Sequence, residues 1–284
     1  MIVTADHELF SWGRGDNGRL GLGNQQSHAL PQPVALEPGF TAKAVKCGVD
    51  CSFVLTQNDR LLACGSNRCN KLALDYGGDE TLDESHTLTP ITEPLVTAEP
   101  VKSVTMGTSH TAILTIGGKC LTFGSNSFGQ LGYEREGASR QPRIVEALKG
   151  KELTFVSCGD TFTIAVSNDK EIYSWGKGTR GRLGHPSDED CFVPKSVILP
   201  MKLKVLSISS SHSVTMVCGK MLWTERIQRQ EPIHTLLTNH MVLWVVDSGS
   251  HQTALWGGGG GWWQRVLWGS WRTSLVGEER VTNP

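Results

Sequence analysis

The sequence predicts an all-β fold built from one unit that is repeated about four times. Three short signatures recur in the same order along the first 218 residues, with a period close to 50 residues. A fixed period of this length is typical of repeat architectures, in which each unit packs on its neighbours. We therefore interpret single residues by their place in the repeat.

The first signature is an apolar segment that ends in glycine. Its closing glycines are 52, 59 and 52 residues apart, at Gly13, Gly65, Gly124 and Gly176. Trp12 and Trp175 precede the first and the last of them. Glycine at the end of a strand allows a positive φ or the close approach of another backbone. We expect these glycines and both tryptophans to be structural positions of the repeat.

Two further signatures complete the unit. Seven residues after each closing glycine stands a Leu-Gly pair, or Leu-Ala in the second repeat; its glycines are Gly21, Gly132 and Gly184. The third signature ends in Gly48, Gly107 and Gly159 and precedes a short apolar run and a polar turn. Such runs, bounded by Gly, Asn or Asp, indicate strands and hairpins.

The unit matches one kind of β structure. No stretch within residues 1–218 keeps a helical apolar period over the length that a helix needs. A unit of about 50 residues with about four short antiparallel strands is a β-propeller blade. We therefore predict a β-propeller of repeated four-stranded blades. Because proline lacks the ladder donor, outer edge strands are expected at Pro33, Pro94, Pro142 and Pro194.

The chain is expected to divide after residue 218. Residues 1–218 carry the repeats, whereas residues 219–284 lose them and hold seven of the nine tryptophans. Local and global signals disagree in this second segment. We interpret residues 219–284 as a divergent Trp/Gly-rich tail that is disordered or an artefact of the gene model; the alternative is a genuine Trp-rich segment.

Composition excludes several classes of protein. A net charge of −1 with 19% charged residues argues against a surface dominated by phosphate contacts. The chain contains no run of 18 apolar residues and no apolar signal region at its start, so neither a membrane span nor secretion is predicted. The eight cysteines lack a disulfide spacing, which favours reduced thiols in the cytosol or nucleus.

No catalytic, cofactor or metal site is predicted. His110 and His212 share one repeat position with Cys51 and Phe162, and a metal site would not accept phenylalanine there. Two G-x-G-x-x-G matches, at 13–18 and 176–181, occupy the same repeat position, without the helix or lysine that phosphate binding needs. We interpret both as structural loops.

The candidate partner-binding residues are polar and lie between the first two signatures. Their first role is either turn formation with hydrogen bonding between blades, or recognition of a partner. They are Arg14, Asp16, Asn17, Arg19, Arg68, Lys71, Lys177, Arg180 and Arg182.

The three signatures together resemble the repeats of the regulator of chromosome condensation family. Within that family, the sequences of residues 12–21 and 158–163 are most similar to the C-terminal propeller of NIMA-related serine/threonine kinases. The resemblance implies a ring that usually has seven blades, of which about four are present, so the chain is expected to be a fragment or an isoform. It also implies protein partners: a kinase domain, a scaffold or a small GTPase. Self-association through open blade faces is a further expectation. The expected location is the cytoplasm, the centrosome or the cilium rather than the nucleus.

Three hypotheses of function follow. The first is a non-catalytic interaction module that regulates a kinase. The second is a guanine-nucleotide exchange factor, as the resemblance to the family's founding member implies, although the basic tail of that type is absent. The third is a non-functional product of a faulty gene model.

Overall fold

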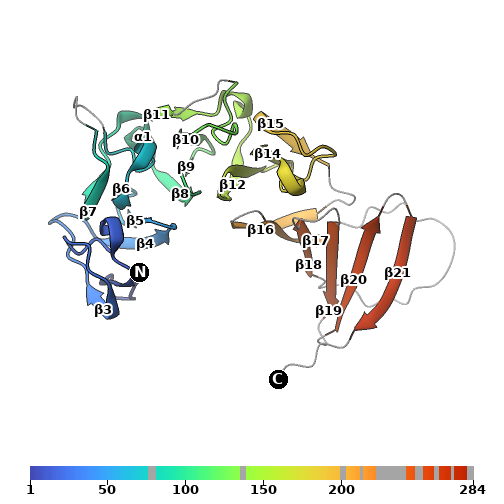
Figure 1. The fold of residues 1–284 in the computed structure, drawn as a ribbon, viewed down its shortest axis with the longest axis horizontal. Helices are drawn as coiled ribbons and strands as arrows, with labels where there is room; N and C mark the ends of the chain where they lie inside the picture. The colour runs from blue at the N-terminus through green and yellow to red at the C-terminus, as the bar shows by residue number, and fades with distance from the viewer. Residues whose placement is uncertain are drawn as a thin grey trace.

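The chain folds into five antiparallel sheets that follow one another along an arc (Figure 1). The computed structural model describes residues 1–75, 81–134, 139–198, 203–211, 214–221, 241–246, 252–258, 262–269 and 272–279. In chain order, the first sheet has three strands, the next three have four each, and the last has six. The predicted all-β propeller is confirmed, as part of a ring. We call the first four sheets blades 1 to 4.

The strands run through each blade in chain order. Blade 1 contains β1 (Ile2–Val3), β2 (Leu9–Gly13) and β3 (His28–Pro33). Blade 2 contains β4 (Ala42–Cys47), β5 (Cys51–Thr56), β6 (Leu61–Ser66) and β7 (Glu84–Pro90). Blade 3 contains β8 (Val101–Met106), β9 (His110–Thr115), β10 (Cys120–Gly124) and β11 (Ser139–Ile144). Blade 4 contains β12 (Leu153–Cys158), β13 (Phe162–Ser167), β14 (Ile172–Gly176) and β15 (Cys191–Val197).

The last sheet contains the remaining strands. They are β16 (Leu203–Ser211), β17 (Val214–Met221), β18 (Met241–Val246), β19 (Gln252–Gly258), β20 (Trp262–Gly269) and β21 (Arg272–Glu279). Part of the tail expected after residue 218 lies on these strands, and a division of the chain there stays a prediction. His212 lies outside the described residues.

The first strands of successive blades lie side by side at the inside of the arc. β8 contacts β4 and β12, and β12 contacts β16. Together β4, β8 and β12 line a cavity of about 540 Å³. The second strand of each complete blade lies deeper: β5, β9 and β13 are buried at every residue. Both faces of these sheets are therefore covered.

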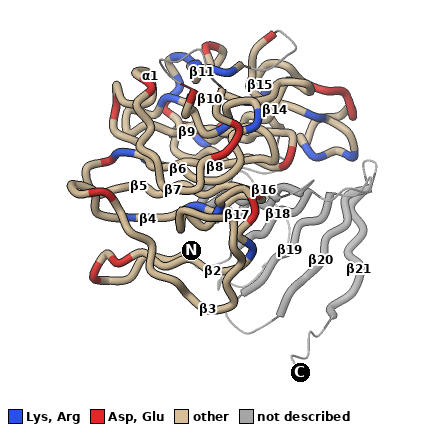
Figure 2. The backbone as a smooth tube through the Cα atoms, turned by 60° about the vertical axis from the view of Figure 1, so that its left-hand side comes forward, with Lys and Arg blue, Asp and Glu red and all other residues tan. Residues whose placement is uncertain are grey.

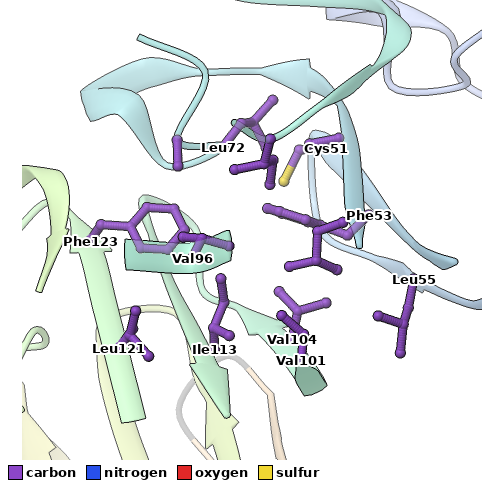
Figure 3. Close-up of a cluster of buried hydrophobic side chains, with 14 residues drawn as sticks. Cys51, Phe53, Leu55, Leu72, Val96, Val101, Val104, Ile113, Leu121 and Phe123 are labelled. Carbon is purple, nitrogen blue, oxygen red and sulfur yellow. The ribbon is translucent and has the colours of Figure 1, made fainter. Parts of the chain in front are cut away.

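The core lies between the blades. Along β5, Phe53 packs on blade 3 in a cluster with Ile113 and Phe123 (Figure 3). The next residue, Val54, packs on blade 1 with Leu9. Successive side chains of a strand point to opposite faces, so each complete blade contributes to two cores.

The proline prediction holds at three positions and is wrong at the fourth. Pro33, Pro142 and Pro194 lie on the outer strands β3, β11 and β15. Pro94 instead begins the short helix α1 (Pro94–Thr97), whose N-cap residue Glu93 accepts a hydrogen bond from the backbone N–H of Val96 at 3.1 Å. Proline suits a first helical turn because its missing N–H has no partner to lose there.

The hairpin before the strand that carries the closing glycine (β2, β6, β10 or β14) contains a left-handed residue in every blade. This residue is Gly118 in blade 3 (φ 78°), but it is His7, Asp59 and Lys170 elsewhere. Placing a residue other than glycine in this left-handed conformation costs about 1–2 kcal/mol.

We expect Lys170→Gly to raise the free energy of unfolding by about 1 kcal/mol, because Lys170 is exposed with φ 70° and glycine adopts this φ without strain. Urea unfolding measures the change. Lys170→Ala keeps the strain and serves as the control, with an expected change below about 0.5 kcal/mol. Equal effects of the two substitutions would contradict the explanation.

Candidate functional site

The candidate residues lie in the loops that join the last two strands of each blade. We call the described residues 14–27, 67–75, 81–83, 125–134 and 177–190 the CD loops; they include the short turns η1 (Asp16–Gly18), η2 (Arg68–Asn70) and η4 (Thr179–Gly181). A further short turn, η3 (Glu146–Leu148), follows β11. Three CD loops contain a left-handed residue other than glycine, at Asn17, Cys69 and Arg180. Each loop also contains a buried leucine, namely Leu20, Leu72, Leu131 or Leu183. Its burial holds the loop against the blade.

The CD loops of blades 1 to 3 are each hydrogen-bonded to the next blade at the same repeat position. A hydroxyl on the second strand of the following blade donates to the carbonyl of the residue before the buried leucine. The bonds are Ser52 Oγ to Arg19 O (2.9 Å), Thr111 Oγ1 to Lys71 O (2.7 Å) and Thr163 Oγ1 to Gln130 O (2.9 Å). We call these bonds the inter-blade hydroxyl bonds. They join these loops to the blade that follows.

The leucine carbonyl is held from within the blade. Ser11, Thr122 and Ser174 donate to the carbonyls of Leu20, Leu131 and Leu183 at 2.6–2.7 Å. Sequence reasoning missed all of these hydroxyls. The signal that could have found them is a serine or threonine at the same place in successive repeats, where a purely packing role would suit valine better.

The candidates in the first CD loop contact one another and blade 2. Arg14 and Asp16 form an exposed ion pair. Asn17 Nδ2 donates to Glu84 Oε2 at 2.9 Å, and this bond is the main cause that lowers the pKa of Glu84. Arg19 Nη1 donates to the carbonyl of Val49 at 2.8 Å. Asn17 and Arg19 therefore join two blades.

Lys71 lies inside the fold. Its side chain is 1% exposed, forms an ion pair with Asp50 and donates to the carbonyl of Thr108 at 2.9 Å. A buried ammonium needs such partners, because an unpaired buried charge is strongly destabilising. Arg182, at the same repeat position in blade 4, is also buried and donates from Nε to Thr179 O at 2.8 Å.

The remaining candidates are on the surface. Arg68 and Arg180 are exposed. Lys177 is partly buried, with its amino group 4.4 Å from the ring centroid of Phe128 in the preceding CD loop. Lysine and arginine residues lie along the loops of blades 3 and 4 in Figure 2. Binding of a partner by these loops stays a prediction.

His110 is a neutral histidine buried between blades 3 and 4. Its Nε2 lies 2.9 Å from Thr163 Oγ1. Since the Thr163 hydroxyl donates to Gln130 O, Nε2 carries the proton and donates to Thr163. Its Nδ1 is buried without a hydrogen-bond partner. Burial lowers the pKa of His110 to about 3.

We expect His110→Phe, which copies Phe162 at the same repeat position, to remove part of the acid sensitivity of folding. Because the folded-state pKa is about 3 and the ordinary value 6.5, the stability that neutral His110 provides is present above pH 6.5 and declines as the pH falls toward 3. The loss between pH 7 and pH 5 should be about 2 kcal/mol larger in the original chain than in the variant. Urea unfolding at the two pH values measures this loss. If the original chain and the variant lost the same free energy of unfolding, His110 would not be the source of the acid sensitivity.

The structure offers no reactive thiol at the buried cysteines. Burial raises the pKa of Cys51 and of Cys158 to about 12, and it also raises the pKa of Cys64 and of Cys120. A thiol is nucleophilic only as the thiolate, so these four groups are inert.

The described residues show neither a metal cluster nor a membrane helix. Among them, no three His, Cys, Asp or Glu side chains are placed to hold a metal ion. In the same part of the chain, no helix is long and apolar enough to cross a membrane.

Both G-x-G-x-x-G matches lie in CD loops. Each ends in a 3-10 turn, η1 or η4, and neither opens an α-helix. In both, the second glycine is packed tightly: a Cβ on Gly15 or Gly178 would lie within about 2 Å of the carbonyl oxygen of Gln26 or Glu189. These glycines therefore permit close packing within the loop.

The blades and the hydroxyl bonds between them define the chain as a β-propeller repeat protein. The model of the Regulator of chromosome condensation (RCC1) repeat matches residues 6–55, 117–166 and 169–218, and a second model of the same description matches residues 101–130 and 154–182. The chain therefore belongs to the RCC1 repeat family.

Two kinds of kinase are similar in sequence. The chain is 42% identical over 234 residues to the serine/threonine-protein kinase Nek8 of Danio rerio, covering 79% of this chain and 33% of that protein. It is 37% identical over 190 residues to Nek9 of Mus musculus, covering 64% and 19%. The chain thus spans a third or less of these relatives. They are kinases through a separate region, and these 284 residues contain no kinase domain.

Solved structures share the fold. Human WBSCR16 aligns with a TM-score of 0.66 at 22% identity, over 78% of this chain and 55% of that one. Prp20p of Saccharomyces cerevisiae aligns with a TM-score of 0.64 at 19% identity, over 77% and 53%. At these identities the likeness concerns the fold.

Proposed function

We propose that this chain is a non-catalytic regulatory module that binds a serine/threonine kinase domain of the NIMA-related type. The observation that carries the proposal is the 42% identity to Nek8 over 79% of the chain. The binding surface that we propose is the row of CD loops. Arg68 and Arg180 are exposed there, and exposed guanidinium groups suit carboxylates on a partner. We also propose that the chain acts in the cytoplasm, at the centrosome or at the cilium.

The test uses the purified chain and the kinase domain of Nek8. We expect the two to bind, and the chain to change the rate at which the domain phosphorylates a protein substrate. The double variant Arg68→Glu and Arg180→Glu should weaken binding about tenfold or more, since it replaces attraction by repulsion. Lys149→Glu is the matched control, because Lys149 is 79% exposed beside η3, outside the CD loops, and should bind normally.

Two outcomes would overturn the proposal. The first is the absence of binding by the folded chain. The second is binding that the double variant and Lys149→Glu weaken equally, which would remove the CD loops from the interface. Faster nucleotide release from a small GTPase, without binding to the kinase domain, would favour the exchange-factor hypothesis instead.

A further inference from the structure

The cavity lined by β4, β8 and β12 has a positively charged wall. Its lining includes two exposed lysines, Lys46 and Lys102, and one carboxylate, Asp160. Its volume of about 540 Å³ lies within the usual range for small-molecule sites, which is about 300–1,000 Å³. The cavity is therefore large enough for a small ligand, and its charge favours an anion.

The first strands of successive blades are joined by a hydroxyl at one repeat position. Thr105 Oγ1 accepts a hydrogen bond from the backbone N–H of Cys158 at 3.1 Å. Ser157 Oγ accepts one from the backbone N–H of Ser210 at 3.0 Å. Thr105 and Ser157 both stand two residues before the glycine of the third signature. A side-chain oxygen at this position thus serves a backbone donor of the next sheet.

Blade 2 has a lysine at this position. Lys46 also stands two residues before its glycine, but an ammonium group is a donor only and has no acceptor. The corresponding backbone donor in blade 3 is the N–H of Met106. Because Gly107 N donates to His110 O on β9 at 2.9 Å, the alternation of the ladder turns the N–H of Met106 away from β9. Residue 46 supplies no oxygen to this N–H.

Two further observations favour an anion in the cavity. Burial raises the pKa of Cys158 in blade 4 to about 12, while the Lys46 ammonium acts to lower it. The ammonium therefore lies within electrostatic range of the opposite wall. In that wall, Ser210 Oγ is buried and has no hydrogen-bond partner within the described residues. A buried hydroxyl without a partner is costly, and a bound acceptor would remove this cost.

We propose that the cavity is an anion site that binds the phosphate groups of a small diphosphate ligand. A phosphate oxygen gives the N–H of Met106 the acceptor that a hydroxyl supplies in the following blades, and Lys46 balances its charge. Lysine, serine and backbone N–H groups are common ligands of phosphate oxygens. Lys102 donates to Thr154 O at 3.1 Å, and because an ammonium has three donors it also binds the second phosphate. The inference is independent of the proposed function.

The test titrates inorganic pyrophosphate into the full chain. Isothermal titration calorimetry should show one pyrophosphate per chain, and succinate, with two carboxylates, should bind at least tenfold more weakly. Labelling with ¹⁵N-methionine restricts the amide spectrum to the six methionines. We expect the amide proton of Met106 to shift downfield on binding, because it gains a charged acceptor. Met106→Leu identifies its signal.

Three variants separate the charge from the missing acceptor. Lys46→Thr copies Thr105, so it should weaken pyrophosphate binding tenfold or more and, without pyrophosphate, raise the unfolding midpoint by about 3 °C. Lys46→Met removes the charge without adding an acceptor; it should weaken binding equally and leave the midpoint unchanged. Lys43→Thr is the matched control on the same strand, since Lys43 is paired with Asp59 at 2.7 Å outside the cavity lining. It should bind normally.

Four results would overturn the proposal. They are no binding by the folded chain, equal weakening by Lys46→Thr and Lys43→Thr, binding that leaves the Met106 amide unmoved, and succinate that binds as tightly as pyrophosphate. An unchanged midpoint in Lys46→Thr would also count against it, because the added hydroxyl would then have met no unpaired donor.

Discussion

Trp175→Ala should lower the free energy of unfolding by about 3–5 kcal/mol, the range for removing a fully buried aromatic side chain. Trp175 is 0% exposed between blades 3 and 4, and its indole N–H is bonded to Gln130 O. The substitution leaves a cavity in that core, which the strands on either side cannot close without losing their register. Urea unfolding followed by far-ultraviolet circular dichroism measures the loss.

Trp12→Ala is the matched control, since both residues stand before the closing glycine of their blade. Trp12 is 38% exposed, so we expect a loss of less than about 1 kcal/mol. Equal losses at the two positions would contradict the explanation that contact with the preceding blade, rather than the residue type, sets the cost.

Gly176→Ala should cost about 3 kcal/mol or more. Gly176 has φ 110°, a conformation that L-residues rarely adopt. A Cβ there would also lie 2.6 Å from the Cα of Phe162 and from the carbonyl oxygen of Thr161, both backbone atoms that cannot rotate away. Strain and overlap therefore add. Chemical unfolding followed by far-ultraviolet circular dichroism measures the cost.

Gly13→Ala separates the two causes. Gly13 has the same repeat position and a φ of 107°, yet a Cβ there would meet nothing within 4 Å. Only the strain applies, so the cost should be about 1–3 kcal/mol. If Gly13→Ala cost as much as Gly176→Ala, overlap with the turn around Phe162 would have no part in the effect.

The repeat made the strands predictable, and it left the interior roles of polar residues hidden. The period located the strand before each closing glycine, because that glycine must reach a positive φ, as Gly65 and Gly124 do. Pro94 was misplaced because the second repeat carries extra residues before it. A period gives the spacing of elements, but it does not show where an insertion is absorbed.

The candidate residues divide for a physical reason. Lysine is rarely buried, so the sequence grouped Lys71 with Arg68 as a candidate for binding a partner. Its burial depends on an ion pair with Asp50 and a hydrogen bond to the carbonyl of Thr108. Thr108 belongs to blade 3, so this carbonyl comes near Lys71 only when blades 2 and 3 pack together. The inter-blade hydroxyl bonds were hidden likewise, because a single threonine does not indicate which carbonyl it will meet.

The inter-blade hydroxyl bonds join each blade only to the next one along the chain. Thr111 reaches Lys71, and Thr163 reaches Gln130; none of the three bonds skips a blade. Such an array follows nearest-neighbour cooperativity, as in a one-dimensional Ising chain. Breaking one bond should uncouple the blades on either side of it. Amide hydrogen exchange in Thr163→Val would then show blades 2 and 3 opening as one unit and blade 4 as another.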